Sequence, residues 1–129
     1  LTEFRKPLKL GVAAILGDGK QVVSWIHIHD LCNIFIEAIE NEQLTGTYNA
    51  VTPYPVTNKA LTLALAKLLH PDFYLTVYVP KFILNLMMGE RSIEVLKSTT
   101  VSSNKIEKAG FTFSYPTIEK ALKQINGVI

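Results

Sequence analysis

The sequence contains a single cysteine, Cys32, in 129 residues, so no disulfide can form within the chain. A lone thiol is typical of proteins that fold in a reducing compartment, which predicts a cytoplasmic location. No lysine or arginine lies close to Cys32 in the sequence. Because a reactive thiol needs electropositive surroundings, we interpret Cys32 as inert.

Long apolar runs and a strong excess of charge are also absent. The longest apolar stretch, residues 82–88, is far shorter than the ~20 residues of a membrane-spanning helix, and it predicts a buried helix instead. Lysine and arginine together number 13 against 11 acidic residues, a net charge of +2. This balance predicts neither a nucleic-acid nor a membrane partner. No signal segment opens the chain, and its first residue is Leu1, so we expect a piece of a longer protein.

The usual motifs of cofactor and catalytic sites are missing too. Gly17 and Gly19 are not followed by a third glycine at the spacing of a dinucleotide fingerprint. His27 and His29 share one strand face, but a metal site needs at least three converging ligands and no third candidate is near. Ser24 is predicted on the opposite face from both histidines, which argues against a serine hydrolase.

The most informative stretch is residues 17–31, which predict a turn, a strand and the start of a helix. Gly17-Asp18-Gly19 supplies the positive φ values of a tight turn. The β-branched and aromatic residues from Val22 to Ile28 predict a strand. Alternation places one set of side chains in the core, namely Val22, Ser24, Ile26 and Ile28. It places the other set on the wall of a binding site, namely Val23, Trp25, His27 and His29.

Asp30 is predicted to end this strand and to cap a helix by accepting backbone N–H groups of its first turn. An amphipathic stripe follows at Leu31, Ile34, Phe35, Ala38 and Ile39. The rest of the chain predicts mostly helices with a few short strands, an α/β pattern. The predicted elements are a strand at 47–51, a helix capped by Thr57 and stopped by 70–72, a strand at 74–79, a helix opened by Pro80, a helix at 90–97, a helix from Ser102 or Ser103 to Gly110, and a last helix opened by Pro116.

The segments Gly17-Asp18-Gly19-Lys20-Gln21 and Ser24-Trp25-Ile26-His27-Ile28, with Asp30, resemble the C-terminal half of extended short-chain dehydrogenase/reductases of the nucleotide-sugar epimerase group. Within that group the chain is most similar to epimerase-like proteins that are sometimes labelled cell-division inhibitors. Their C-terminal segment is a domain of unknown function. The resemblance continues through 46–51, 53–57, 79–80, 86–91, 110–116 and 118–122.

The resemblance implies an α/β fold, the C-terminal fragment of a Rossmann-type dehydrogenase. Residues 1–129 would form a single substrate-binding domain, with the N-terminal dinucleotide-binding half absent. The family's catalytic Tyr-x-x-x-Lys is also absent, because the residues four positions after the tyrosines are Thr52, Asn58, Tyr78, Phe82 and Glu119. We therefore expect the fragment alone to be inactive and to hold no cofactor. NAD or NADP would belong to the full-length parent.

Four residues are candidates for substrate binding. Trp25 would stack on a sugar or base, and Gln21 and His27 would line the same pocket. Arg91 is the fourth, since the resemblance implies an arginine that holds the substrate diphosphate with its planar fork. The structural alternative for Trp25 is burial in packing, and that for Arg91 is an ordinary surface position with an ion pair to Glu90 or Glu94.

Two functions remain open. The chain is either the substrate-binding lobe of an NAD(P)-dependent nucleotide-sugar epimerase or reductase, or a non-catalytic interaction module that dimerises through the strand at 47–51. That strand would lack its neighbours in the isolated fragment. A Trp25 that faces a pocket favours the first. A Trp25 buried in packing, together with a strand paired to a second chain, favours the second.

Overall fold

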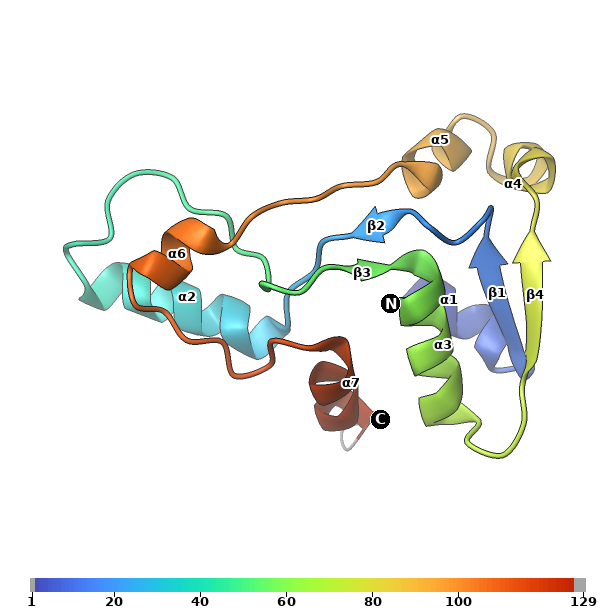
Figure 1. Cartoon of the computed structure of the whole chain (residues 1–129), viewed down its shortest axis with the longest axis horizontal. Coiled ribbons are helices and arrows are strands. Elements are labelled where there is room, and N and C mark those ends of the chain that lie inside the picture. The colour runs from blue at the N-terminus through green and yellow to red at the C-terminus, as the bar shows by residue number, and fades with distance from the viewer. Residues whose placement is uncertain (1, 127–129) are drawn as a thin grey trace.

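The computed structural model describes the backbone of residues 2–126 and the side chains of residues 5–86, 89, 90, 92, 93 and 96–125. The chain is α/β, with short strands among more numerous helices (Figure 1). In order the elements are α1 (Thr2–Leu8), β1 (Val12–Leu16), β2 (Val22–Val23), α2 (Ile28–Glu40), β3 (Val56–Thr57), α3 (Asn58–Leu69), β4 (Leu75–Val79), α4 (Lys81–Met88), α5 (Arg91–Leu96), α6 (Asn104–Lys108) and α7 (Ile118–Asn126). In this part of the chain, no helix combines the length and apolarity needed to cross a bilayer.

The larger core forms around a parallel pair of strands. β1 pairs with β4 in the register Val12↔Leu75 to Leu16↔Val79, and the connection between them contains α3, which packs against β1. α7 lies against α3 on the other side. The buried residues of this core are Leu8, Ala13, Leu61, Leu65, Ala66, Ile118 and Leu122. β1 is absent from the predicted elements, because only its pairing with a strand about sixty residues away distinguishes it from a loop.

The second strand pair, β2 and β3, lies in the middle of the molecule. β2 and β3 are antiparallel, with Val22 opposite Thr57 and Val23 opposite Val56. On the other side of β2, the segment 98–101 lies alongside. The Ser24 hydroxyl donates to the carbonyl of Thr99 at 2.7 Å and accepts the N–H of Val101 at 3.1 Å. Ser24 therefore holds two segments together and is occupied by backbone groups.

A smaller core lies at the far end of the molecule from β1 and β4 (Figure 1). Ile34 of α2 meets Ile106 of α6 and Phe113 there, and all three are buried. Tyr48 and Ala50 pack against the same cluster. This core is where the amphipathic pattern of α2 makes its contact within the chain.

Several predictions about turns and helix ends are confirmed. Gly17 and Gly19 have φ values of 59° and 71°, as the predicted turn requires. Thr57 caps α3, since its hydroxyl accepts the N–H of Ala60 at 3.1 Å. The apolar residues that recur with the helical period on α3 and α7 face the larger core. These features depend on residues close together in sequence.

Four predictions were wrong. The strand predicted over residues 22–28 is paired only at Val22 and Val23, because α2 begins at Ile28. Ile28 was predicted in the core, but it is exposed. The N-cap of α2 is His27, not Asp30. Residues 47–51 form no strand, because a strand needs a partner and none of the described residues pairs with it. The helix at 82–88 is not buried all round, since Phe82 and Leu86 are exposed.

Thr62 offers a test of packing in α3. Its side chain is buried, and its hydroxyl has no hydrogen-bond partner among the described residues. Because an unpaired buried hydroxyl costs free energy, we expect Thr62→Val to raise the free energy of unfolding by about 1 kcal/mol. Urea unfolding of the intact protein measures this change. The matched control is Thr57, the capping residue of the same helix, because Thr57→Val should lower the free energy of unfolding by about 1 kcal/mol.

Candidate functional site

The glycine turn is fastened to the N-terminus of α3. The carbonyl of Gly19 accepts the N–H of Lys59 at 3.0 Å, and the carbonyl of Gln21 accepts the N–H of Asn58 at 2.9 Å. A phosphate cradle needs these helix N–H groups free and aimed at the ligand. Here they are occupied by the turn itself, so the turn does not fit the pyrophosphate of a dinucleotide. Any cofactor would have to be held by other residues.

Gln21 is buried and supports this turn from inside. Its side-chain amide donates to the carbonyl of Leu16 at 3.0 Å. The N–H of Leu16 in turn donates to the side-chain oxygen of Asn58 at 3.1 Å. The two bonds join the end of β1, the turn and the start of α3. Gln21 thus fixes the local backbone, and its amide nitrogen is already paired.

Trp25 is half-buried and joins the extended segment to the loop before β3. Its ring packs against the larger core, and its indole N–H donates to the carbonyl of Tyr54 at 3.0 Å. The backbone adds a second link, since the N–H of Thr52 donates to the carbonyl of Trp25 at 2.8 Å. Of Gln21, Trp25 and His27, only Trp25 keeps a partly exposed surface.

His27 is buried at the start of α2 with both ring nitrogens engaged. Nδ1 accepts the N–H of His29 at 3.2 Å, which caps the helix. Nε2 lies 3.0 Å from the side-chain oxygen of Gln124, so the hydrogen-bond network assigns the ring proton to Nε2. The imidazole also lies on the ring of Tyr115, with centroids 4.2 Å apart. These contacts link α2 to α7.

Asp30 has a structural role that the sequence analysis missed. Its carboxylate is fully buried, and its two oxygens accept the N–H groups of Ser114 at 2.8 Å and Tyr115 at 2.9 Å. Charge-assisted bonds of this kind are stronger than neutral ones. The partners lie 84 and 85 residues away in sequence. No local pattern could indicate them.

Gln21, Trp25 and His27 therefore lie along one extended segment, where each contacts a different part of the fold, and they do not converge on one pocket. Residues 21–27 fasten α3, the loop before β3 and α7 to one extended segment. The side chain of Arg91, the fourth candidate, lies outside the described residues. His29 is exposed, with Nδ1 3.1 Å from the side-chain nitrogen of Asn33. In the described part of the chain, no three His, Cys, Asp or Glu side chains gather as they would around a metal.

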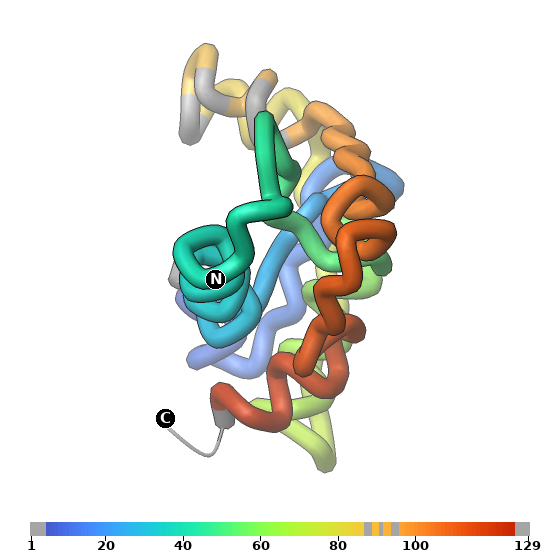
Figure 2. The backbone as a smooth tube through the Cα atoms, turned by 90° about the vertical axis from the view of Figure 1, so that its left-hand side faces the viewer, coloured from blue at the N-terminus to red at the C-terminus, as the bar shows by residue number. Residues whose placement is uncertain are grey.

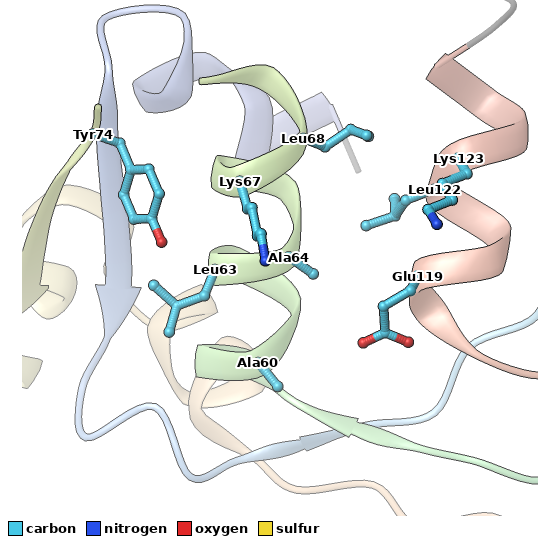
Figure 3. Close-up of a pocket in the computed structure, with 9 residues that line it drawn as sticks. All are labelled: Ala60, Leu63, Ala64, Lys67, Leu68, Tyr74, Glu119, Leu122 and Lys123. Atoms are coloured by element: carbon cyan, nitrogen blue, oxygen red, sulfur yellow. The ribbon is translucent and has the colours of Figure 1, made fainter. Parts of the chain in front are cut away.

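The cavity found between α3 and α7 is at a different place. It has a volume of about 580 Å³ and an apolar floor, with Lys67, Lys123 and Glu119 at its rim (Figure 3). The other lining residues are Ala60, Leu63, Ala64, Leu68, Tyr74 and Leu122. None of the candidates Gln21, Trp25 and His27 lines it. The sequence analysis did not predict this hollow, because two helices distant in sequence create it.

Comparison with known proteins identifies relatives over most of the chain. Residues 79–125 match the family described as Domain of unknown function (DUF1731). An epimerase family protein of Staphylococcus aureus (strain MRSA252) is 32% identical over 125 residues, which is 97% of this chain and 41% of that protein. The epimerase family protein YfhF of Bacillus subtilis (strain 168) is 33% identical over 119 residues, 92% of this chain and 39% of that protein.

The chain resembles the C-terminal part of epimerase family proteins. Solved structures of this family agree with the fold. Human epimerase family protein SDR39U1 (isoform 2), solved with NADPH, aligns with a TM-score of 0.87 and 27% identity, over 99% of this chain and 43% of that one. A nucleoside-diphosphate sugar epimerase from Corynebacterium glutamicum aligns with a TM-score of 0.59 and 31% identity, over 82% and 19%. The chain thus spans less than half the length of these epimerase relatives.

Proposed function

We propose that this chain is the substrate-binding part of an NAD(P)-dependent nucleotide-sugar epimerase or reductase, and that it does not catalyse the reaction by itself. The observation that supports this most directly is the alignment of 99% of the chain with part of an epimerase family protein solved with NADPH. The relatives extend well beyond the aligned part. The remainder of the polypeptide would bind the dinucleotide and supply the catalytic residues.

The contacts of Gln21 and His27 support a role in positioning the indole of Trp25. A binding site needs rigid backbone, because loosely held groups lose affinity when they are ordered by the ligand. Gln21 and His27 are each buried and hydrogen-bonded at their ends. Trp25 lies between them in the sequence and is half-buried. In this proposal the indole supplies the stacking surface, and the other two hold it in place.

The test measures binding of UDP-glucose and of NADPH to the full-length protein expressed from its natural reading frame, by isothermal titration calorimetry. Aromatic stacking on a base is worth about 1–3 kcal/mol. We therefore expect Trp25→Ala to weaken UDP-glucose binding by about tenfold or more, and Trp25→Phe to retain most of it. Phe73→Ala is the matched control, since Phe73 is an exposed aromatic residue outside the segment.

Two results would contradict the proposal. Unchanged UDP-glucose affinity in a folded Trp25→Ala variant removes Trp25 from the site. No binding of UDP-glucose or any other nucleotide sugar to the wild-type protein removes the substrate class. Far-UV circular dichroism and thermal unfolding of each variant verify that the loss of the half-buried indole has not unfolded the protein.

A second candidate, a non-catalytic interaction module, is favoured by one observation. α2 exposes several large apolar side chains, and the segment after it makes no backbone ladder among the described residues. Under this hypothesis two copies pair through residues 47–51. Light scattering of the full-length protein distinguishes the two functions, because the module predicts a dimer without nucleotide-sugar binding.

A further inference from the structure

The hollow between α3 and α7 is separate from the residues proposed above to bind a nucleotide sugar. Gln21, Trp25 and His27 do not line it. Figure 1 and Figure 2 both place α7 beside α3 at the lower end of the molecule, and the two helices are in contact. The volume of the hollow, about 580 Å³, falls within the ~300–1,000 Å³ that is usual for small-molecule sites. Its size therefore permits a ligand.

The floor of the hollow consists of short and aliphatic side chains. Ala60, Ala64 and Leu68 are spaced four residues apart on α3, so they share one side of the helix. Figure 3 shows this side turned toward α7, from which Leu122 points back toward α3. The two alanines create the space, because their side chains end at Cβ. Replacing water on such a floor by an apolar group is favourable.

The rim of the hollow carries two ammonium groups, one from each helix. Lys67 belongs to α3 and Lys123 to α7, and both side chains are exposed. Neither lysine has an ion-pair partner among the described residues, although Glu119 lies at the same rim. A lysine can lay its aliphatic stem along an apolar surface and keep its ammonium at the edge. Two cations against one carboxylate leave the rim positive, which favours an anion.

The length of each wall limits what can occupy the hollow. On α3 the lining runs from Ala60 to Leu68, about 12 Å at a rise of 1.5 Å per residue. On α7 it runs only from Glu119 to Lys123, about 6 Å. A docked α-helix is about 10–12 Å wide with its side chains, so one turn of α7 is too short a wall to hold it. A single aliphatic chain is narrower and fits these dimensions.

We propose that the hollow between α3 and α7 binds a small amphipathic carboxylate. Its aliphatic chain lies on Ala60, Ala64 and Leu122, and its carboxylate lies between Lys67 and Lys123. Charge-assisted bonds from two ammonium groups to one carboxylate are stronger than neutral hydrogen bonds. The floor thus supplies affinity for the chain, and the lysines select the head group. This site goes beyond the proposed function and does not depend on it.

The test measures binding of decanoate to the full-length protein by isothermal titration calorimetry, below the concentration at which decanoate forms micelles. We expect saturable binding. Decyltrimethylammonium has the same chain with a cationic head, and we expect it to bind at least about tenfold more weakly. Raising the NaCl concentration from about 50 mM to about 500 mM should weaken the binding of decanoate, because salt screens the attraction between exposed charges.

The lysines are tested with the double variant Lys67→Met and Lys123→Met, which removes both charges and keeps unbranched apolar side chains. We expect it to bind decanoate at least about tenfold more weakly than wild type. The matched control is Lys108→Met, since Lys108 is an exposed lysine of α6 outside the hollow. Ala64→Trp fills the floor without changing the charge, and it should abolish binding. Far-UV circular dichroism verifies that each variant is folded.

Four results would overturn the proposal. The first is no binding of decanoate to the wild-type protein, as expected if another part of the full-length protein or a second copy covers the hollow. The second and third are equal affinities of the double lysine variant and wild type, or of the two amphiphiles. The fourth is displacement of decanoate by saturating NADPH or UDP-glucose, which would put decanoate in the nucleotide site. Decanoate binding without nucleotide binding would retain this site and remove the enzymatic function, so the two proposals fail separately.

Discussion

Replacing Asp30 by alanine is expected to lower the free energy of unfolding by about 4 kcal/mol, because two backbone N–H groups lose a buried carboxylate. The donors are those of Ser114 and Tyr115, at 2.8 and 2.9 Å. Each unsatisfied donor costs about 1–3 kcal/mol, and the substitution also leaves a small void beside α2. Urea unfolding of the intact protein, followed by circular dichroism, measures the loss.

Asp30→Asn separates charge from shape. The amide keeps the volume and one acceptor, but it presents an N–H₂ group where the carboxylate accepted the second bond. We expect Asp30→Asn to lower the free energy of unfolding by about 2 kcal/mol, so that its stability lies between those of wild type and Asp30→Ala. Asp72 is an exposed aspartate whose side chain makes no hydrogen bond with the described residues, so Asp72→Ala should change stability by less than about 0.5 kcal/mol. Equal effects at the two aspartates would show that the buried carboxylate contributes little.

Gly19→Ala is expected to cost about 3 kcal/mol, since two penalties coincide at this position. Gly19 has a φ of 71°, which residues with a Cβ rarely adopt. A Cβ here would also lie 2.5 Å from Cγ2 of Ile15 and 2.9 Å from Cβ of Lys59. Ile15 is buried in β1, so it has little room to move. Thermal unfolding of the intact protein measures the change.

Gly11 is the matched control for this substitution. It has the same φ of 71°, but a Cβ added there would meet nothing within 4 Å. Gly11→Ala should therefore cost only the backbone part, about 1 kcal/mol. The difference between the two variants measures the steric part at Gly19. If both variants lost the same amount, the close approach of the turn to α3 would not matter for stability.

The local features of the fold followed from residues that are close together in sequence. Glycine at positions 17 and 19 is needed for positive φ, and Thr57 offers a hydroxyl to the first turn of α3. The helix stripes of α3 and α7 repeat with the period of the helix, so their buried faces could be predicted. The α/β class and the family resemblance followed from the same short segments.

The candidate site shows how far such patterns extend. Alternation placed Trp25 and His27 on one face, yet it could not indicate that Nε2 of His27 meets Gln124 or that the indole of Trp25 meets Tyr54. Asp30 looked like a helix cap because aspartate often is one. Its true partners come from the other end of the chain. Whether these side chains also bind a nucleotide sugar stays a prediction.

By itself, the sequence determined the glycine turn, the buried faces of α3 and α7 and the N-cap of α3, because these depend on backbone preferences and on contacts a few residues apart. Only the tertiary structure decided that Val12–Leu16 is a strand and that residues 47–51 are not. The physical reason is the same in both cases. A strand exists only when another strand pairs its backbone groups; β4 does so for β1, and no described residue does so for 47–51.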